Sequence, residues 1–123
     1  MMRASKIERL CSNQSLMALW VTIYMSLMGK QGVKDAAQLS YDGAHYLHEQ
    51  LLATGRFTAT FSRPFFNEFC VDFNGDVDAL QKHLIDNGVL GGVKVDANTI
   101  MFAVTERRSK EEIDRLVELI KQF

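Results

Sequence analysis

The stretch Leu16–Met28 constrains the fold most, because its apolar side chains go all the way round a helix. In these thirteen residues only Thr22 and Ser26 interrupt eleven apolar side chains. A helix that is hydrophobic on every side is normally buried all round, whereas a membrane span needs ~20 apolar residues. The run therefore predicts a helix that other protein must cover, and it predicts no membrane span.

The length and composition limit how much of the apolar helix this chain itself can cover. With 123 residues, 47% hydrophobic and 24% charged, it is typical of one globular domain, 1–123. A chain of this size buries roughly two-thirds of its unfolded surface, which supports two layers and no third. The net charge of −1 with scattered Lys and Arg excludes the basic stripe of nucleic-acid binders. Without a signal peptide, the cytoplasm is the expected location.

The sequence of the first half of the chain predicts an N-terminal arm followed by two helices. We expect the arm over residues 1–12 and the two helices within 13–52. Ser12 or Asn13 can cap the first helix, and Gly29 ends it. The second helix is expected from Val33 to Leu52. Its apolar flank consists of Ala36, Ala37, Ala44, Leu47 and Leu51.

The second half, residues 57–123, alternates between strand and helix patterns. Alternating side chains predict strands at 57–61 and 69–73, and Asp76 is placed to cap a helix over 76–87. A short strand within Gly88–Asp96 and a central strand at 100–104 follow. Ser109 and Glu112 form a capping box for a helix at 109–122. The predicted fold is α+β, a two-layer sandwich of a short, mainly antiparallel sheet with helices, and 57–123 is its βαβ-type core.

Aromatic side chains cluster along the two predicted strands and the segment between them. We expect them to form the core: Phe57, Phe61, Phe65, Phe66, Phe69 and Phe73. Cys11 and Cys70 stand far apart without a second cysteine nearby, so packed small thiols are expected and not a disulfide.

Motifs for catalysis are missing from the sequence. It holds no phosphate-binding glycine loop, no nucleophile elbow and no metalloprotease helix, so no catalytic residue is assigned. His45 and His48 share one helical face, but a metal site needs more ligands. A semi-buried histidine pair is expected there, and His83 is expected to be solvated. No metal is predicted.

Two short segments hold polar residues that can border a pocket. Cys11, Ser12 and Asn13 lie at the start of the first predicted helix, where the helix dipole lowers the pKa of a thiol. Glu106 and Arg107 end the last predicted strand, where an arginine can hold a carboxylate. For each segment the residues alone favour a plainer interpretation, namely a packed cysteine and a solvated turn.

Several longer strings occur in one order and carry a family resemblance. They are CSNQSLMALWVTIYMSLMGKQGVKDAA, SYDGAHYL, RPFFNEFCVDFNGD, HLIDNGVLGG and AVTERRSKEEIDRL. Together they resemble the C-terminal end of the glycine cleavage system P-protein, glycine dehydrogenase (decarboxylating). The likeness is strongest to the first subunit of its split two-subunit form, and it covers about Cys11 to Phe123.

The resemblance implies a fragment of a pyridoxal-phosphate (PLP) enzyme of fold type I, similar to its small C-terminal domain. The family enzyme decarboxylates glycine and passes the aminomethyl group to the lipoyl arm of the H-protein. The lysine that holds PLP lies in a different region, and in the split form it belongs to the second subunit. The chain alone is therefore expected to bind no cofactor and to be inactive, as one part of the enzyme.

The resemblance also explains the apolar helix. Trp20, Tyr24, Met25 and Met28 are predicted to face the rest of the subunit and the PLP-bearing second subunit, and to drive self-association of the isolated chain. Two alternatives remain. One is a free-standing ferredoxin-like binding or dimerisation module that contacts ligands through Gly88–Gly92. The other is a metal-binding regulator that uses His45 and His48.

Overall fold

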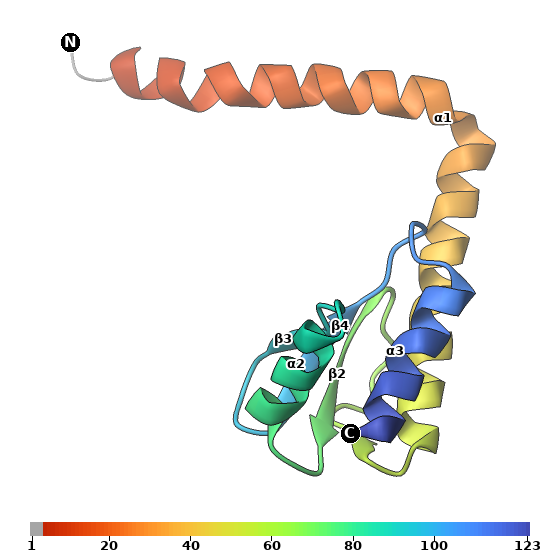
Figure 1. The fold of residues 1–123 in the computed structure, drawn as a ribbon. Coiled ribbons are helices and arrows are strands. Elements are labelled where there is room, and N and C mark those ends of the chain that lie inside the picture. Colours follow the sequence, from red (N-terminus) through yellow and green to blue (C-terminus); the bar gives the residue numbers. More distant parts are fainter. Residues whose placement is uncertain (1–3) are drawn as a thin grey trace. The chain divides into compact units, whose positions relative to one another are not determined.

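The computed structural model describes the backbone of residues 4–123 and the side chains from residue 14 onward. The helices are α1 (Ala4–Ala53), α2 (Val77–Asp86) and α3 (Lys110–Gln122). The strands are β1 (Phe57–Ala59), β2 (Glu68–Phe73), β3 (Val93–Lys94) and β4 (Thr99–Ala103). The chain forms two compact units that meet within α1: unit 1 ends at Asp35, and unit 2 is Ala36–Phe123 (Figure 1).

Unit 1 consists of the first part of α1, which is interrupted at Gly29. This glycine has φ 65° and ψ 176°, a conformation open essentially to glycine only. The predicted break at Gly29 is therefore confirmed. The helix begins at Ala4, so the expected cap at Ser12 or Asn13 is wrong. Good helix formers such as Lys6, Glu8 and Arg9 precede that point and extend the helix.

The sheet of unit 2 is antiparallel, with the strand order β1-β2-β4-β3. Cys70 of β2 is opposite Met101 of β4, which in turn is opposite Val93 of β3. The predicted antiparallel sheet and the interior position of β4 are confirmed. The chain order is strand-strand-helix-strand-strand-helix, which differs from the strand-helix-strand-strand-helix-strand order of a ferredoxin-like sheet.

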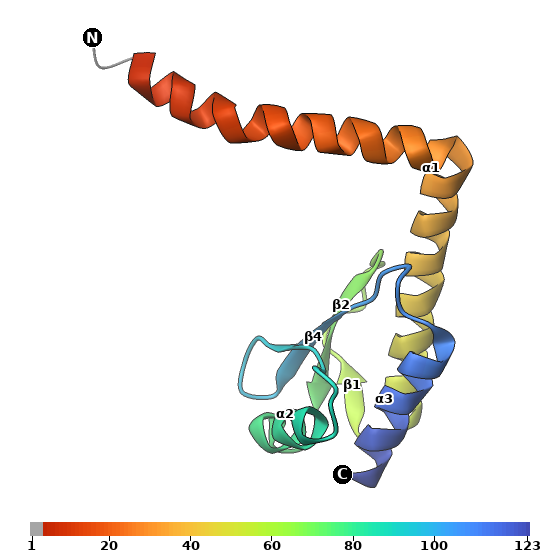
Figure 2. The ribbon, with the colours of Figure 1, turned by 45° about the horizontal axis from the view of Figure 1, so that its top comes forward.

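The three helical segments of unit 2 bury one face of this sheet. Phe69, Val71 and Phe73 point to that face, as their alternation predicts. They join one apolar cluster with the last turns of α1 and with α2 and α3, which lie beside the sheet in Figures 1 and 2. The helical members are Ala44, Leu47, Leu51, Val77, Leu80, Leu84, Ile113, Leu116, Val117 and Ile120. This is the two-layer arrangement expected from the sequence.

Three predicted core residues lie outside the core. Phe61 and Phe66 are exposed, because β1 ends at Ala59 and the alternation of a strand no longer applies beyond it. Ala37 is exposed too, and Ala36 is half-buried, so the apolar flank of α1 begins later than expected.

The predicted N-cap of α2 at Asp76 is present, and its contribution to stability can be measured. The Asp76 carboxylate accepts hydrogen bonds from the backbone N–H of Asp78 at 2.9 Å and of Ala79 at 3.2 Å. We expect Asp76→Ala to lower the free energy of unfolding by about 1 kcal/mol, because those donors lose their partner. Urea denaturation measures the loss. Asp86→Ala, at the other end of α2, is the control and should cost nothing, since an acid there opposes the helix dipole.

Candidate functional site

The surface of unit 1 is apolar around the helix over residues 16–27. Trp20 is 69% exposed and Leu27 is 82% exposed. The other exposed large apolar side chains of this stretch are Leu16, Met17, Leu19, Val21, Ile23, Tyr24 and Met25. The two polar interruptions are satisfied within the helix, because Thr22 Oγ1 donates to Ala18 O at 2.8 Å and Ser26 Oγ donates to Thr22 O at 2.7 Å. The stretch therefore offers apolar surface and little polar surface.

The predicted interface residues share this surface. Trp20, Tyr24 and Met25 are exposed. Met28 is half-buried because its side chain lies against Gly32, where an added Cβ would be 3.4 Å from Met28 Cε. What covers these residues stays a prediction. Across the part of the chain that the structure describes, no helix is long and apolar enough to cross a membrane.

In unit 2, a hollow of ≈ 480 Å³ lies between the Gly88–Val93 segment, β4 and the start of α3. Its charged lining residues are Arg108, Glu112 and Arg115. Arg108 Nη1 is 3.2 Å from Glu112 Oε1, and Arg115 donates to Asn87 O at 3.0 Å. Both arginines therefore already have partners. Sequence reasoning missed this grouping, because only Glu112 and Arg115 share a helical face, whereas Arg108 precedes the helix and joins them through the packing of the fold.

Two of the pocket-edge candidates from the sequence, Glu106 and Arg107, do not line this hollow. Glu106 and Arg107 lie in the exposed turn after β4, where the N–H of Arg107 donates to Thr105 Oγ1 at 3.4 Å. The neighbouring Arg108 borders the hollow instead. The side chains of Cys11, Ser12 and Asn13 lie outside the described residues.

The two histidines of α1 are packing residues among the aromatics. The ring of His45 stacks on Phe65 with centroids 4.2 Å apart, and that of His48 meets Phe69 edge-on at 5.1 Å. Burial, helped by the nearby charge of His45, lowers the pKa of His48. Among the residues with described side chains, no group of three or more His, Cys, Asp or Glu could hold a metal.

His83 on α2 is not solvated as the sequence suggested. Its Nε2 is 3.2 Å from Leu119 O, and its ring lies 5.4 Å from that of Phe123. Packing of α2 beside α3 brings these groups together and half-buries the imidazole.

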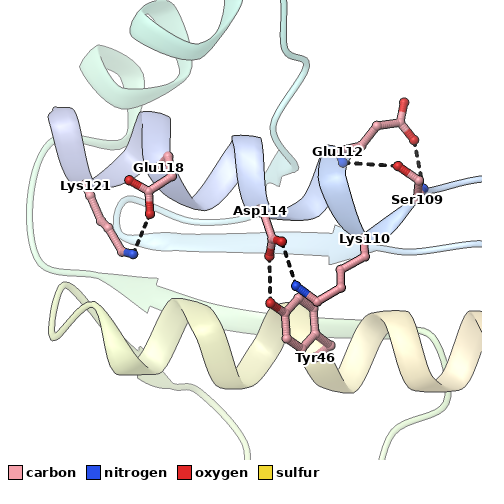
Figure 3. A network of polar contacts seen from close by, with 7 residues as sticks. All are labelled: Tyr46, Ser109, Lys110, Glu112, Asp114, Glu118 and Lys121. Atoms are coloured by element: carbon pink, nitrogen blue, oxygen red, sulfur yellow. Dashed lines mark hydrogen bonds and ion pairs between the residues drawn. The ribbon is translucent and has the colours of Figure 1, made fainter.

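A polar contact joins α1 to α3 within unit 2, as Figure 3 shows. Tyr46 Oη donates to Asp114 Oδ1 at 2.6 Å, and Lys110 Nζ is 2.7 Å from Asp114 Oδ2. Lys110 also lies over the Tyr46 ring, 4.8 Å from its centroid. The hydrogen bond from Lys110, and then that from Tyr46, lowers the pKa of Asp114. The bond to Asp114 raises the pKa of Lys110.

Removing the tyrosine hydroxyl should move the titration of Asp114. We expect Tyr46→Phe to raise the pKa of Asp114 towards its ordinary value of 3.8, because one stabilising donor is lost. A carboxyl with a lowered pKa adds stability above its unfolded pKa and loses it as the pH falls through the folded value. Unfolding of Tyr46→Phe should therefore depend less on pH below 3.8. Carbon-13 NMR titration measures the pKa, and an unchanged value would contradict the assigned bond.

One known protein family matches almost the whole length of this chain. The family model described as the glycine cleavage system P-protein matches residues 2–120. The chain belongs to the glycine cleavage system P-protein family. The resemblance carried by the quoted sequence strings is thereby confirmed.

Curated P-protein relatives extend well beyond the matched region. A probable glycine dehydrogenase (decarboxylating) subunit 1 of Anoxybacillus flavithermus is 38% identical over 127 residues, which cover 98% of this chain and 28% of the relative. A protein of the same description from Bacillus mycoides is 43% identical over 121 residues, covering 94% of this chain and 27% of the relative. The chain thus spans little more than a quarter of these relatives.

Solved structures agree with the P-protein assignment. A glycine decarboxylase (P-protein) of the glycine cleavage system, in inhibitor-bound form, superposes with a TM-score of 0.75 at 31% identity. The match covers 81% of this chain and 24% of that one. A phosphoserine aminotransferase of Cytophaga hutchinsonii has a TM-score of 0.64 at 15% identity, which shows a shared fold alone. The predicted α+β fold, with structural neighbours among fold type I PLP enzymes, is confirmed.

Proposed function

We propose that this chain is the C-terminal domain of a glycine dehydrogenase (decarboxylating) subunit of the split form. The observation that carries the proposal is the family match over residues 2–120, together with relatives described as subunit 1. The whole enzyme would decarboxylate glycine with PLP and transfer the aminomethyl group to the lipoyl H-protein, in the cytoplasm. This chain would contribute structure and contacts and no catalytic residue.

The lysines of this chain support a cofactor site elsewhere. A lysine that forms a Schiff base must lose its proton readily, which burial favours. Every lysine with a described side chain is exposed: Lys30, Lys34, Lys82, Lys94, Lys110 and Lys121. Lys94, Lys110 and Lys121 are also paired with carboxylates, at 2.7 Å each. These residues do not fit a PLP anchor.

We propose that this chain contacts the rest of the enzyme through the apolar helix of unit 1. Its partners would be the rest of the subunit and the PLP-bearing second subunit, with Trp20, Tyr24, Met25 and Met28 at the contact. Large contiguous apolar patches on soluble proteins usually mark interaction sites. Without those partners the same surface would cause the isolated chain to self-associate, so the enzyme is proposed to be an oligomer.

A chimera tests the proposed function. The stretch of the Anoxybacillus flavithermus subunit 1 that aligns with this chain is replaced by this chain. The product is then assembled with its second subunit, PLP and H-protein. We expect glycine decarboxylation, measured as exchange of labelled bicarbonate into glycine, within tenfold of the unaltered enzyme. A chimera that assembles yet decarboxylates no glycine would contradict the proposal and favour a separate binding module.

A further inference from the structure

The sheet of unit 2 has a second face that the helices leave open. On the buried face lie Phe69, Val71 and Phe73 of β2, with Ile100 and Phe102 of β4. Strand alternation puts Cys70 and Met101 on the opposite face. Both are half-buried, although α1, α2 and α3 pack on the other side.

The open face has an apolar row at its centre and polar groups beside it. Cys70, Met101 and Val93 lie in register across three strands, so their side chains are neighbours. In the next row on this face, Thr99 Oγ1 donates to Asp72 Oδ1 at 2.6 Å. An apolar centre with a satisfied polar border is the usual anatomy of a protein interface.

A hollow of ≈ 620 Å³ lies at one end of the sheet and reaches both of its faces. Cys70 and Met101 of the open face line it, together with Phe61 and Pro64 from the loop before β2 and with Phe69 and His48 from the helix-covered face. Phe61 is 67% exposed, which is costly for a phenylalanine in water. In the same loop Thr60 Oγ1 is buried without a hydrogen-bond partner among the described residues, so the packing here is incomplete.

We propose that this open sheet face is a second docking surface, covered in the complete enzyme by P-protein sequence outside the stretch represented here. The proposal rests on the proposed function. The length of the relatives supports this occupant, because this chain spans only 24% of the solved glycine decarboxylase chain and 28% of the Anoxybacillus flavithermus relative. Most of the family protein is therefore available as cover. Phe61 inserts into that cover, and the Cys70 thiol becomes sealed beneath it.

Alkylation of Cys70 by N-ethylmaleimide tests the proposal. The rate is followed on the Cys70 peptide by mass spectrometry, in the isolated chain at low concentration and in the chimera assembled with its second subunit. We expect at least tenfold slower alkylation in the chimera. Equal rates in an active chimera would overturn this inference alone, whereas an assembled but inactive chimera would overturn the proposed function and this inference with it.

Two matched substitutions separate docking from a general change in reactivity. Phe61→Lys in the chimera should restore Cys70 alkylation at least tenfold, because a charge replaces the inserted ring. Phe66→Lys is the control in the same loop, since Phe66 is 54% exposed but does not line the hollow. It should leave the rate within twofold. Equal effects of both substitutions would contradict the assignment.

A last experiment uses the isolated chain. Cys70 alkylation is repeated across a range of chain concentrations. We expect a constant rate, because self-association through unit 1 leaves the sheet face open. Slowing with concentration would identify a second copy as the occupant and overturn the proposal. A thiol already as slow in the dilute isolated chain as in the chimera would overturn it as well.

Discussion

Gly92→Ala is expected to destabilise unit 2 by roughly 3 kcal/mol, through two costs that act at one position. Gly92 has φ +69°, where a side chain costs about 1–2 kcal/mol. A Cβ there would also lie 2.6 Å from Ile100 Cγ2 and 2.9 Å from the carbonyl oxygen of Met101. The carbonyl belongs to the central strand β4 and cannot move without disturbing the ladder, and such overpacking costs about 1–3 kcal/mol.

Gly88→Ala is the matched control at the other end of the same loop. Gly88 has φ +75°, but nothing lies within 4 Å of a Cβ built there. It should therefore lose only the conformational cost, about 1–2 kcal/mol. Urea denaturation of the two variants gives the difference. Equal losses would show that close approach to β4 does not matter.

The second large effect is expected at the apolar helix of unit 1. The double variant Trp20→Glu with Met25→Glu should weaken self-association of the isolated chain by at least ~100-fold. Burial of one such side chain is worth about 1.5–3 kcal/mol, and both are lost. Sedimentation equilibrium measures the change, and circular dichroism should show unchanged helix content.

Leu39→Glu is the control for that variant. Leu39 is an exposed apolar residue of α1, but it lies beyond the 16–28 run. It should leave association within about twofold. A double variant that associates as strongly as Leu39→Glu would refute the assignment of the interface to Trp20 and Met25.

The sequence predicted unit 2 well because its signals are local. The Asp76 cap, the Ser109–Glu112 capping box and the alternation of Phe69, Val71 and Phe73 each depend on neighbours within a few residues. The continuous apolar run at 100–104 also predicted a central strand, and β4 is an interior strand of the sheet. Such features are fixed by periodicity and capping.

The errors arose where local signals compete or end. Ser12 and Asn13 are good cap residues, yet the helix formers before them extend α1 to Ala4. Phe61 follows the alternation of β1, but the strand pairing stops at Ala59. The hollow beside Arg108 and the open sheet face depend on strand order and helix packing, which no local pattern encodes. Both required the three-dimensional structure.

We propose that protein outside this chain covers its apolar helix, and Trp20 lies on that surface and can report on the covering. Trp20 is the only tryptophan, so 5-fluorotryptophan labelling gives a single fluorine NMR resonance. The labelled chain is mixed with unlabelled Anoxybacillus flavithermus subunit 1 that lacks the aligned stretch. Covering of Trp20 should shift the resonance and remove its dependence on the H₂O-to-D₂O ratio. An unshifted, solvent-sensitive resonance in a complex that co-elutes on gel filtration would contradict the claim.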